Sequence, residues 1–190
     1  MGVFDGAVCD AAMKKIAAGD MDGVDIIYKH LGKQIYTLAL SILGNETAAE
    51  DVMQETFLRI MNSAGTYVPE RGGARTWILA VTRNLAIDRE RKEHAGLWAD
   101  LSEDVPAEDV YARIDDADEA ERILGALDGI ERQIVVLRVV QRLKWKEVAG
   151  IIGRSESRTR MIFSDAVGKI RKITGKGKSD EGIQNDTQEV

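Results

Sequence analysis

Apolar residues recur every three or four positions through the first third of the chain, which is the spacing of one buried helix face. The first such stripe consists of Ile27, Leu31, Ile35, Leu38 and Ile42. It predicts a long helix over residues 24–43 that stops at Gly44. A second helix is expected over residues 47–63, because its apolar positions repeat the pattern and Thr47 followed by Glu50 resembles a capping box.

A loop and a third helix follow. Residues 64–73 contain three glycines and Pro69, which disfavour regular helix and predict a surface loop. The helix after the loop has one apolar face, formed by Trp77, Ile78, Val81 and Leu85. Much of its remaining surface is expected to be basic because it carries Arg75, Arg83, Arg89, Arg91 and Lys92.

Helical periodicity stops between residues 96 and 116, where acidic side chains gather around Pro106. A segment of this composition buries too little apolar surface to fold, so it predicts a flexible acidic linker. The polar residues 174–190 predict a disordered tail. The chain is therefore expected to fold as two small all-α domains, over residues 1–95 and 117–173.

The second domain has the pattern of a helix-turn-helix. Two short helices are expected on either side of Gly129, followed by a helix over residues 144–151 and a turn at Gly153. The last helix begins after Ser155, whose hydroxyl is a good N-cap, and runs to about residue 173. Such a final helix can enter the major groove of DNA, although any small helical bundle contains a similar turn.

Composition narrows the functional classes. The 190 residues are 44% hydrophobic and 31% charged with a net charge of −6, as in ordinary globular proteins. Cys9 is the only cysteine, and neither it nor His30 or His94 belongs to a metal-binding motif. No phosphate loop or nucleophile motif is present, so we expect no enzyme activity, cofactor or metal. Without a signal segment or an apolar run of about 20 residues, the sequence predicts a cytoplasmic protein that does not insert into membranes.

Two surfaces of the first domain have more than one interpretation. Trp77 among arginines suits melted nucleic acid, because aromatic rings stack on unpaired bases, yet a tryptophan at helical spacing is commonly part of a core. Residues 49–58 expose acidic side chains beside Phe57 and Leu58. That face either docks a protein or is a solvated amphipathic helix.

In order and spacing, residues 17–173 resemble the extracytoplasmic-function sigma factors of bacteria. The stretch 49–59, AEDVMQETFLR, is similar to the family's segment that grips the coiled coil of the largest subunit of core RNA polymerase. The resemblance implies core-binding roles for Glu50, Asp51, Gln54, Glu55, Phe57 and Leu58.

The basic helix resembles the family segment that opens and reads the minus-10 promoter element. The likeness lies in residues 77–78, 83–88 and 91–92. It implies that the loop before Trp77 receives a flipped base, at a cost of a few kcal/mol of lost stacking. The implied minus-10 residues are Arg75, Trp77, Arg83, Asn84, Arg89 and Lys92.

The second domain resembles the family's minus-35-binding region over residues 126–153, but its recognition helix departs from the pattern. Ser157 stands where the family usually has glycine, and Ile162 and Asp165 stand at usual arginines. An aspartate repels phosphate, so the minus-35 preference is expected to be weak or unusual; alternatively Arg158 and Arg160 dominate docking while Asp165 accepts from a cytosine amino group. The implied minus-35 residues are Arg154, Ser155, Arg158, Thr159, Arg160 and Asp165.

The resemblance implies a sigma factor without catalysis of its own. Its expected partners are the two largest subunits of core RNA polymerase, promoter DNA and an anti-sigma factor, and no small-molecule substrate is expected. The acidic linker would then thread toward positively charged channels of the polymerase, or serve only as a tether. Two alternatives remain: a decoy that titrates an anti-sigma factor, which Ile162 and Asp165 favour, and an operator-binding regulator, which leaves the first 95 residues unexplained.

Overall fold

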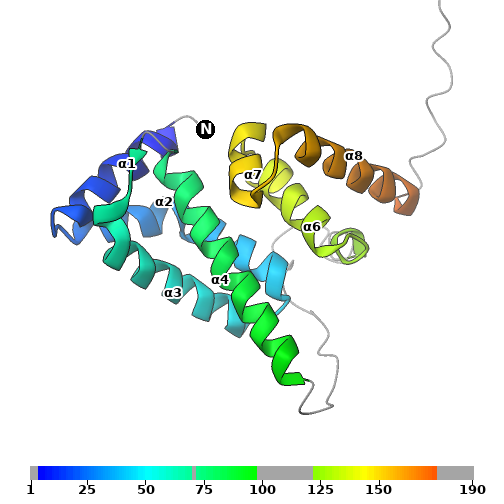
Figure 1. Cartoon of the computed structure of the whole chain (residues 1–190), viewed down its shortest axis with the longest axis horizontal. Coiled ribbons are helices and arrows are strands. Elements are labelled where there is room, and N and C mark those ends of the chain that lie inside the picture. Colours follow the sequence, from blue (N-terminus) through cyan, green and yellow to red (C-terminus); the bar gives the residue numbers. More distant parts are fainter. Residues whose placement is uncertain (1–3, 70–71, 98–121, 175–190) are drawn as a thin grey trace, which may run out of the picture.

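The computed structural model describes residues 4–69, 72–97 and 122–174, and within these ranges every regular element is helical (Figure 1). This confirms the all-α class. The linker expected at 96–116 and the tail expected at 174–190 lie almost wholly outside the described residues. The first domain contains α1 (Phe4–Ala17), α2 (Asp22–Leu43), α3 (Glu46–Ser63), the short 3₁₀ helix η1 (Ala64–Thr66) and α4 (Ala74–Leu97).

The second domain is a compact bundle of short helices. After a helical turn at 122–125 come α6 (Gly129–Val135), the π-helical turn η3 (Val136–Val140), α7 (Trp145–Ile152) and α8 (Glu156–Ile173). Gly153 adopts a left-handed conformation with φ of 72°, which few residues other than glycine tolerate, and it ends α7. The Ser155 side chain accepts a hydrogen bond from the backbone N–H of Arg158, which confirms the predicted cap of α8.

The core of the first domain is built around α2. Its predicted stripe is confirmed: Ile27, Leu31, Ile35 and Leu38 are fully buried, with α1, α3 and α4 packed around the helix. The helix ends at Gly44, which has φ of 65°. Burial of this continuous stripe supplies the main apolar driving force of the domain.

The start of α3 differs from the prediction. The capping box of Thr47 and Glu50 is wrong, because α3 begins at Glu46 and its N-cap is Asn45. The Asn45 side chain accepts a hydrogen bond of 2.8 Å from the backbone N–H of Ala48. Asparagine is at least as good an N-cap as threonine, and the turn at Gly44 delivers Asn45 in the extended conformation that a cap requires.

Helix α1 was not predicted, and it anchors the start of α4. Its buried face consists of Cys9, Ala12, Met13 and Ile16. Asp10, on the same helix, accepts hydrogen bonds from the backbone N–H of Ala74 at 2.6 Å and from the hydroxyl of Tyr67 at 2.7 Å. One carboxylate therefore fixes both the loop before α4 and the first turn of that helix.

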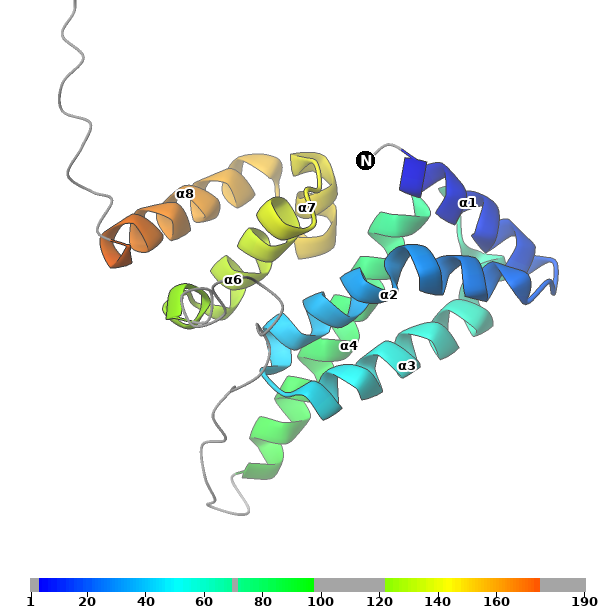
Figure 2. The same cartoon turned by 180° about the vertical axis from the view of Figure 1, so that it is seen from behind.

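The two domains pack directly against each other. Helix α4 lies against α7, and α2 lies against α6 and η3, as the two opposite views show (Figures 1 and 2). The hydrophobic core is continuous across this boundary, since it joins Ile78 and Leu79 of α4 to Leu137, Leu143 and Val148 of the second domain. The structure is thus a closed arrangement of the two domains.

Membrane insertion finds no support in the described helices. None of them combines the length and the apolar character that crossing a bilayer requires.

Candidate functional site

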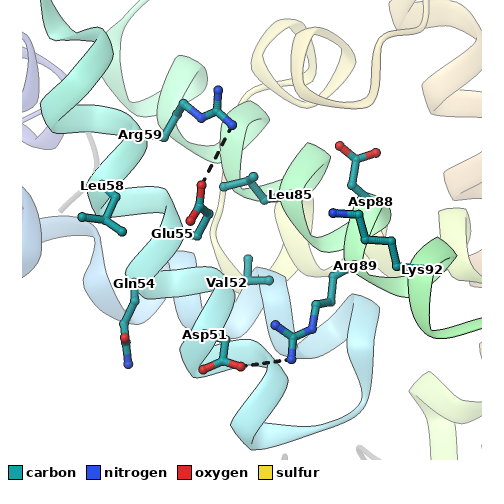
Figure 3. Close-up of a pocket in the computed structure, with 10 residues that line it drawn as sticks. All are labelled: Asp51, Val52, Gln54, Glu55, Leu58, Arg59, Leu85, Asp88, Arg89 and Lys92. Atoms are coloured by element: carbon teal, nitrogen blue, oxygen red, sulfur yellow. Dashed lines mark hydrogen bonds and ion pairs between the residues drawn. The ribbon is translucent and has the colours of Figure 1, made fainter. Parts of the chain in front are cut away.

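A groove with a volume of about 530 Å³ runs between α3 and α4 (Figure 3). Helix α3 lies on the opposite side of α4 from α7 (Figures 1 and 2). Four of the six predicted core-binding residues line it: Asp51, Gln54, Glu55 and Leu58. From α4 come Leu85, Asp88, Arg89 and Lys92. The groove therefore combines residues that the sequence assigned to two different tasks, polymerase binding and minus-10 recognition.

Charged side chains that line the groove form two exposed pairs, one across it and one along α3. Arg89 donates a hydrogen bond of 3.0 Å to Asp51, and Arg59 lies 4.0 Å from Glu55 along α3 (Figure 3). These side chains are between 40% and 54% exposed, so solvent screens both ion pairs. Charges of a binding partner can therefore replace either pair at little cost in free energy.

An apolar rim borders the acidic side of the groove. Leu58 is 50% exposed on the surface of α3, an unusual degree for a leucine. Phe57 is half-buried and packs against Tyr28 of α2, with ring centroids 5.7 Å apart. Glu50, the remaining predicted core-binding residue, is exposed. Apolar groups beside charges are what a docked helix of another protein requires.

The predicted minus-10 residues divide between two faces of α4. Arg89 and Lys92 belong to the groove and Asn84 is exposed, whereas Arg75, Trp77 and Arg83 turn toward the packed side. Trp77 is half-buried against the core and its ring centroid lies 6.0 Å from that of Tyr67. The two interpretations of Trp77, core residue and base platform, are both compatible with this half-burial.

Arg75 is enclosed in a polar cluster at the domain boundary. Its side chain is only 8% exposed, and its Nε and Nη2 both donate to Oε1 of Gln34, at 2.9 and 2.7 Å. Nη2 also donates to the backbone carbonyl of Gln141 at 2.9 Å, while Nε2 of Gln141 donates to the carbonyl of Gln34. In this closed arrangement the guanidinium has no surface to offer to DNA.

Arg83 makes the second polar contact between the domains. Its Nε donates a hydrogen bond of 2.7 Å to Oε1 of Gln133 on α6. Burial lowers the pKa of Arg83, and the nearby cations Arg154 and Arg91 lower it further. A predicted minus-10 arginine and a predicted minus-35 arginine are thus within electrostatic reach of each other.

Helix α8 and the turn before it present most of the predicted minus-35 residues to solvent. Arg154, Ser155, Arg158, Arg160 and Asp165 are exposed. Thr159 is fully buried and its hydroxyl donates to the carbonyl of Ser155, so it does not belong to the exposed face. Ile162, where the family usually has arginine, packs against the hydrophobic core.

Sequence reasoning missed an aromatic and cationic cluster at the start of α7. The guanidinium carbons of Arg138 and Arg160 each lie 5.0 Å from the ring centroid of Trp145, and Phe163 meets that ring edge-on at 5.1 Å. Stacking of this kind orients a guanidinium without neutralising it. Trp145 was visible near the start of the helix predicted over residues 144–151, but its arginine partners depend on how the helices pack.

The glutamines at the domain boundary were also missed. Gln34, Gln133 and Gln141 follow no pattern that marks an interface.

No candidate metal site was found among the described residues. Their histidine, cysteine, aspartate and glutamate side chains form no group of three that could hold an ion.

Comparison with known families and structures gives two consistent matches. Residues 27–95 match the family model for Sigma-70 region 2, and residues 123–172 match that for Sigma-70, region 4. Together they span more than half of the chain. The first match contains α2 to α4 with the groove, and the second contains the helix-turn-helix.

Relatives at the sequence level are named ECF RNA polymerase sigma factor SigK. The one from Mycobacterium ulcerans (strain Agy99) is 28% identical over 174 residues, covering 85% of this chain and 91% of the relative. The one from Mycobacterium tuberculosis (strain ATCC 25177 / H37Ra) is 28% identical over 170 residues, with the same coverage.

Two solved structures share the fold over both domains. The structure of CnrH in complex with the cytosolic domain of CnrY has a TM-score of 0.69 at 19% identity, and covers 90% of this chain and 99% of that one. The sigma factor RpoE from Bartonella quintana, in complex with the anti-sigma factor NepR, has a TM-score of 0.64 at 18% identity. It covers 77% of this chain and 92% of that one.

Proposed function

The chain belongs to the extracytoplasmic-function sigma factors, and from this premise we propose that it docks on core RNA polymerase through the α3–α4 groove and directs it to promoters. The groove itself carries the proposal. It is open, it is lined by exposed and weakly paired charges, and it has an apolar rim at Leu58. The expected partner is a helical coiled coil of the largest polymerase subunit, whose own charges would replace the pairing between Asp51 and Arg89.

Promoter recognition is proposed for the remaining surfaces. Once the second domain no longer covers it, the face of α4 with Arg75, Trp77, Arg83 and Asn84 would read and open the minus-10 element. There the arginines would follow phosphates and the aromatic ring would stack on an unpaired base. The exposed face of α8, with Arg158 and Arg160, would enter the major groove of the minus-35 element. Arg160 is held against Trp145, so its guanidinium is oriented before DNA binds.

Regulation by an anti-sigma factor is proposed because the chain shares its fold with RpoE, which was solved in complex with the anti-sigma factor NepR. The protein would act in the cytoplasm, with the second-largest polymerase subunit as an additional contact and no catalytic step of its own. A decoy function gains nothing from Ile162, because this side chain has a packing role in the core.

The groove assignment is tested with the double variant Asp51→Arg with Gln54→Ala. Reversing one charge and removing one amide in the groove should weaken core binding by about tenfold or more, because like charges then face each other across the interface. The circular dichroism spectrum and the unfolding midpoint should stay close to wild type, since both side chains are exposed. Core binding is measured with a fluorescently labelled chain.

A matched control is Asp25→Arg, which reverses an exposed acidic charge on α2 outside the groove. It should bind core polymerase like the wild type. Undiminished core binding by the double variant would contradict the groove assignment.

The function as a whole is tested by adding the purified protein to core RNA polymerase and a promoter library, and then mapping the transcript starts. Promoter-specific starts that require the protein support the proposal. Binding to an anti-sigma protein alone would support the decoy, and operator binding without core polymerase would support a conventional regulator.

A further inference from the structure

The first turn of α4 is fixed by a carboxylate from another helix. The first backbone N–H groups of a helix have no partner within that helix and need an acceptor from elsewhere. At α4 the N–H of Ala74 donates to Oδ1 of Asp10, on α1, at 2.6 Å. A negative charge at a helix N-terminus also interacts favourably with the helix dipole. Asp10 therefore acts as a cap for α4 that comes from a segment 64 residues earlier.

The same carboxylate oxygen also holds the loop before α4. The Tyr67 hydroxyl donates to Oδ1 of Asp10 at 2.7 Å, and it lies 3.1 Å from the backbone carbonyl oxygen of Gly72. The Tyr67 ring in turn lies beside Trp77, with ring centroids 6.0 Å apart. Trp77 belongs to the first turn of α4, where its N–H donates to the carbonyl of Gly73. Asp10 thus reaches Trp77 along two routes, through the loop and through the start of the helix.

Few other contacts restrain the backbone where α4 begins. Gly72 and Gly73 directly precede the helix, and glycine has the largest backbone conformational freedom of any residue. Apart from chain neighbours, no described atom would lie within 4 Å of a Cβ placed on Gly72. For Gly73 the corresponding atom would be Oδ1 of Asp10, at 3.9 Å. The restraint on this pair of glycines therefore comes mainly from Asp10 and from the Tyr67 hydroxyl that it binds.

Helix α1 gives Asp10 a firm base. The apolar face of this helix is buried, and α1 packs against α2, α4 and η1. These apolar contacts hold α1 in place, so the polar contacts of Asp10 act on the start of α4 and not on the packing of α1 itself. Asp10 also lies before residue 27, where the match to Sigma-70 region 2 begins.

We propose that Asp10 is a positioning residue for promoter opening, which holds Tyr67 and the first turn of α4 so that the Trp77 ring meets unpaired minus-10 bases in one orientation. This inference rests on the proposed function, in which Trp77 stacks on melted DNA. A ring that is ordered before DNA binds loses less conformational entropy on stacking than a ring that is free to move. Asp10 acts through Trp77 and does not itself touch the DNA.

The test compares Asp10→Ala with Asp10→Asn. Alanine removes the acceptor, whereas asparagine keeps Oδ1 for both hydrogen bonds and loses only the charge. The promoter is one that the wild-type protein selects from the library, with a fluorescent base analogue in the minus-10 element that reports opening. The dependence of the opening rate on holoenzyme concentration separates initial promoter binding from opening. Lys14→Ala, an exposed change on α1, is the matched control.

Asp10→Ala should lower the maximal opening rate about tenfold, as expected from the loss of two hydrogen bonds to a charged group. Core affinity and initial promoter binding should stay within about twofold of wild type, because Asp10 lies outside the groove. Asp10→Asn should restore the opening rate to within about threefold of wild type, and Lys14→Ala should leave it unchanged. A wild-type opening rate in Asp10→Ala, or a parallel loss of core binding, would overturn the proposal.

A double-mutant cycle tests whether Asp10 acts through Trp77. Trp77→Leu keeps an apolar side chain but removes the ring that would stack on a base. In the Trp77→Leu background, Asp10→Ala should have little further effect on the opening rate, because the side chain that it positions is already lost. Independent losses that multiply would contradict the proposal.

Tyr67→Phe is a milder change that serves if Asp10→Ala does not fold. It removes only the hydroxyl and should slow opening about threefold, with core binding unchanged. An unchanged opening rate in every folded variant of Asp10 and Tyr67 would overturn the proposal. A wild-type protein that gives no promoter-specific starts would instead refute the proposed function, so the two failures can be distinguished.

Discussion

The two faces of α4 differ in almost every physical respect. One face lines a groove in which Lys92 is exposed and Arg89 is half-buried, with a solvent-screened pair to Asp51. The other face carries Arg75, 8% exposed with three hydrogen bonds from its guanidinium group, and Arg83, bound to the second domain. One helix therefore carries an arginine in a solvent-screened ion pair on one side, and arginines held by the domain boundary on the other. Residue type alone does not reveal which arginine lies in the groove and which is covered at the domain boundary.

Charge reversal on each face of α4 should separate core binding from promoter opening, and this is the largest expected effect. Arg89→Glu places a second anion beside Asp51 and should weaken core binding about tenfold, whereas Arg83→Glu should leave core binding near wild type. Arg83→Glu should instead reduce promoter opening by a similar factor, because a phosphate contact becomes repulsive. Fluorescence binding to core and permanganate footprinting of melted promoter DNA measure the two effects. Equal loss of core binding in both variants would abolish the distinction between the faces.

Alanine substitution should produce a smaller difference, in stability. Arg75→Ala removes buried hydrogen bonds to a charged group and should lower the free energy of unfolding by roughly 2–4 kcal/mol. Arg59→Ala, in the groove, should cost roughly 0–0.5 kcal/mol, because its pair with Glu55 is long and exposed. Urea denaturation followed by circular dichroism gives both values. A comparable loss of unfolding free energy in the two variants would mean that Arg75 is solvated and that the two domains are not packed together.

How far the sequence predicts this molecule depends on the kind of feature. The α2 stripe and the turn at Gly153 are confirmed because each follows from local rules of burial and of backbone conformation. Helix α1 escaped prediction because small side chains such as Ala12 and Cys9 dominate its buried face and give a weak pattern. The groove residues of α3 were predicted by resemblance, and their partners on α4 emerged only from packing.

The domain boundary was the least predictable part. Gln34 is about a hundred residues from Gln133 and Gln141, and none of the three carries a charge or a periodicity that marks an interface. Arg75 and Arg83 were predicted to bind DNA. An arginine side chain suits DNA binding as well as it suits the interdomain hydrogen bonds that these two residues make. Whether such an arginine is exposed or covered depends on the position of a whole domain, which no local rule specifies.

The smallest expected effect concerns an ion pair of the second domain that lies outside both faces. Nζ of Lys169 donates a hydrogen bond of 2.7 Å to Glu131, and this bond raises the pKa of Lys169 above its ordinary value of 10.5. A raised lysine pKa stabilises the folded state below the ordinary value, and this stability is lost as pH rises through the folded-state pKa. Lys169→Met should therefore lower the urea midpoint slightly at pH 7, and the difference from wild type should disappear only as pH rises through the raised pKa of Lys169. A difference that persisted at high pH would indicate a packing effect instead of an ion pair.

The most direct test of the central claim, that the second domain covers one face of α4 while the groove on its other face is open, is a distance between the two domains. Spin labels at Lys29→Cys on α2 and Lys146→Cys on α7 use exposed positions, and the buried Cys9 should not react. The free protein should give one short distance, and the complex with core polymerase and promoter DNA should give a distance longer by tens of Å, as expected of minus-10 and minus-35 elements that lie about 85 Å apart along DNA, at about 3.4 Å per base pair. The same short distance in an active promoter complex would contradict the account.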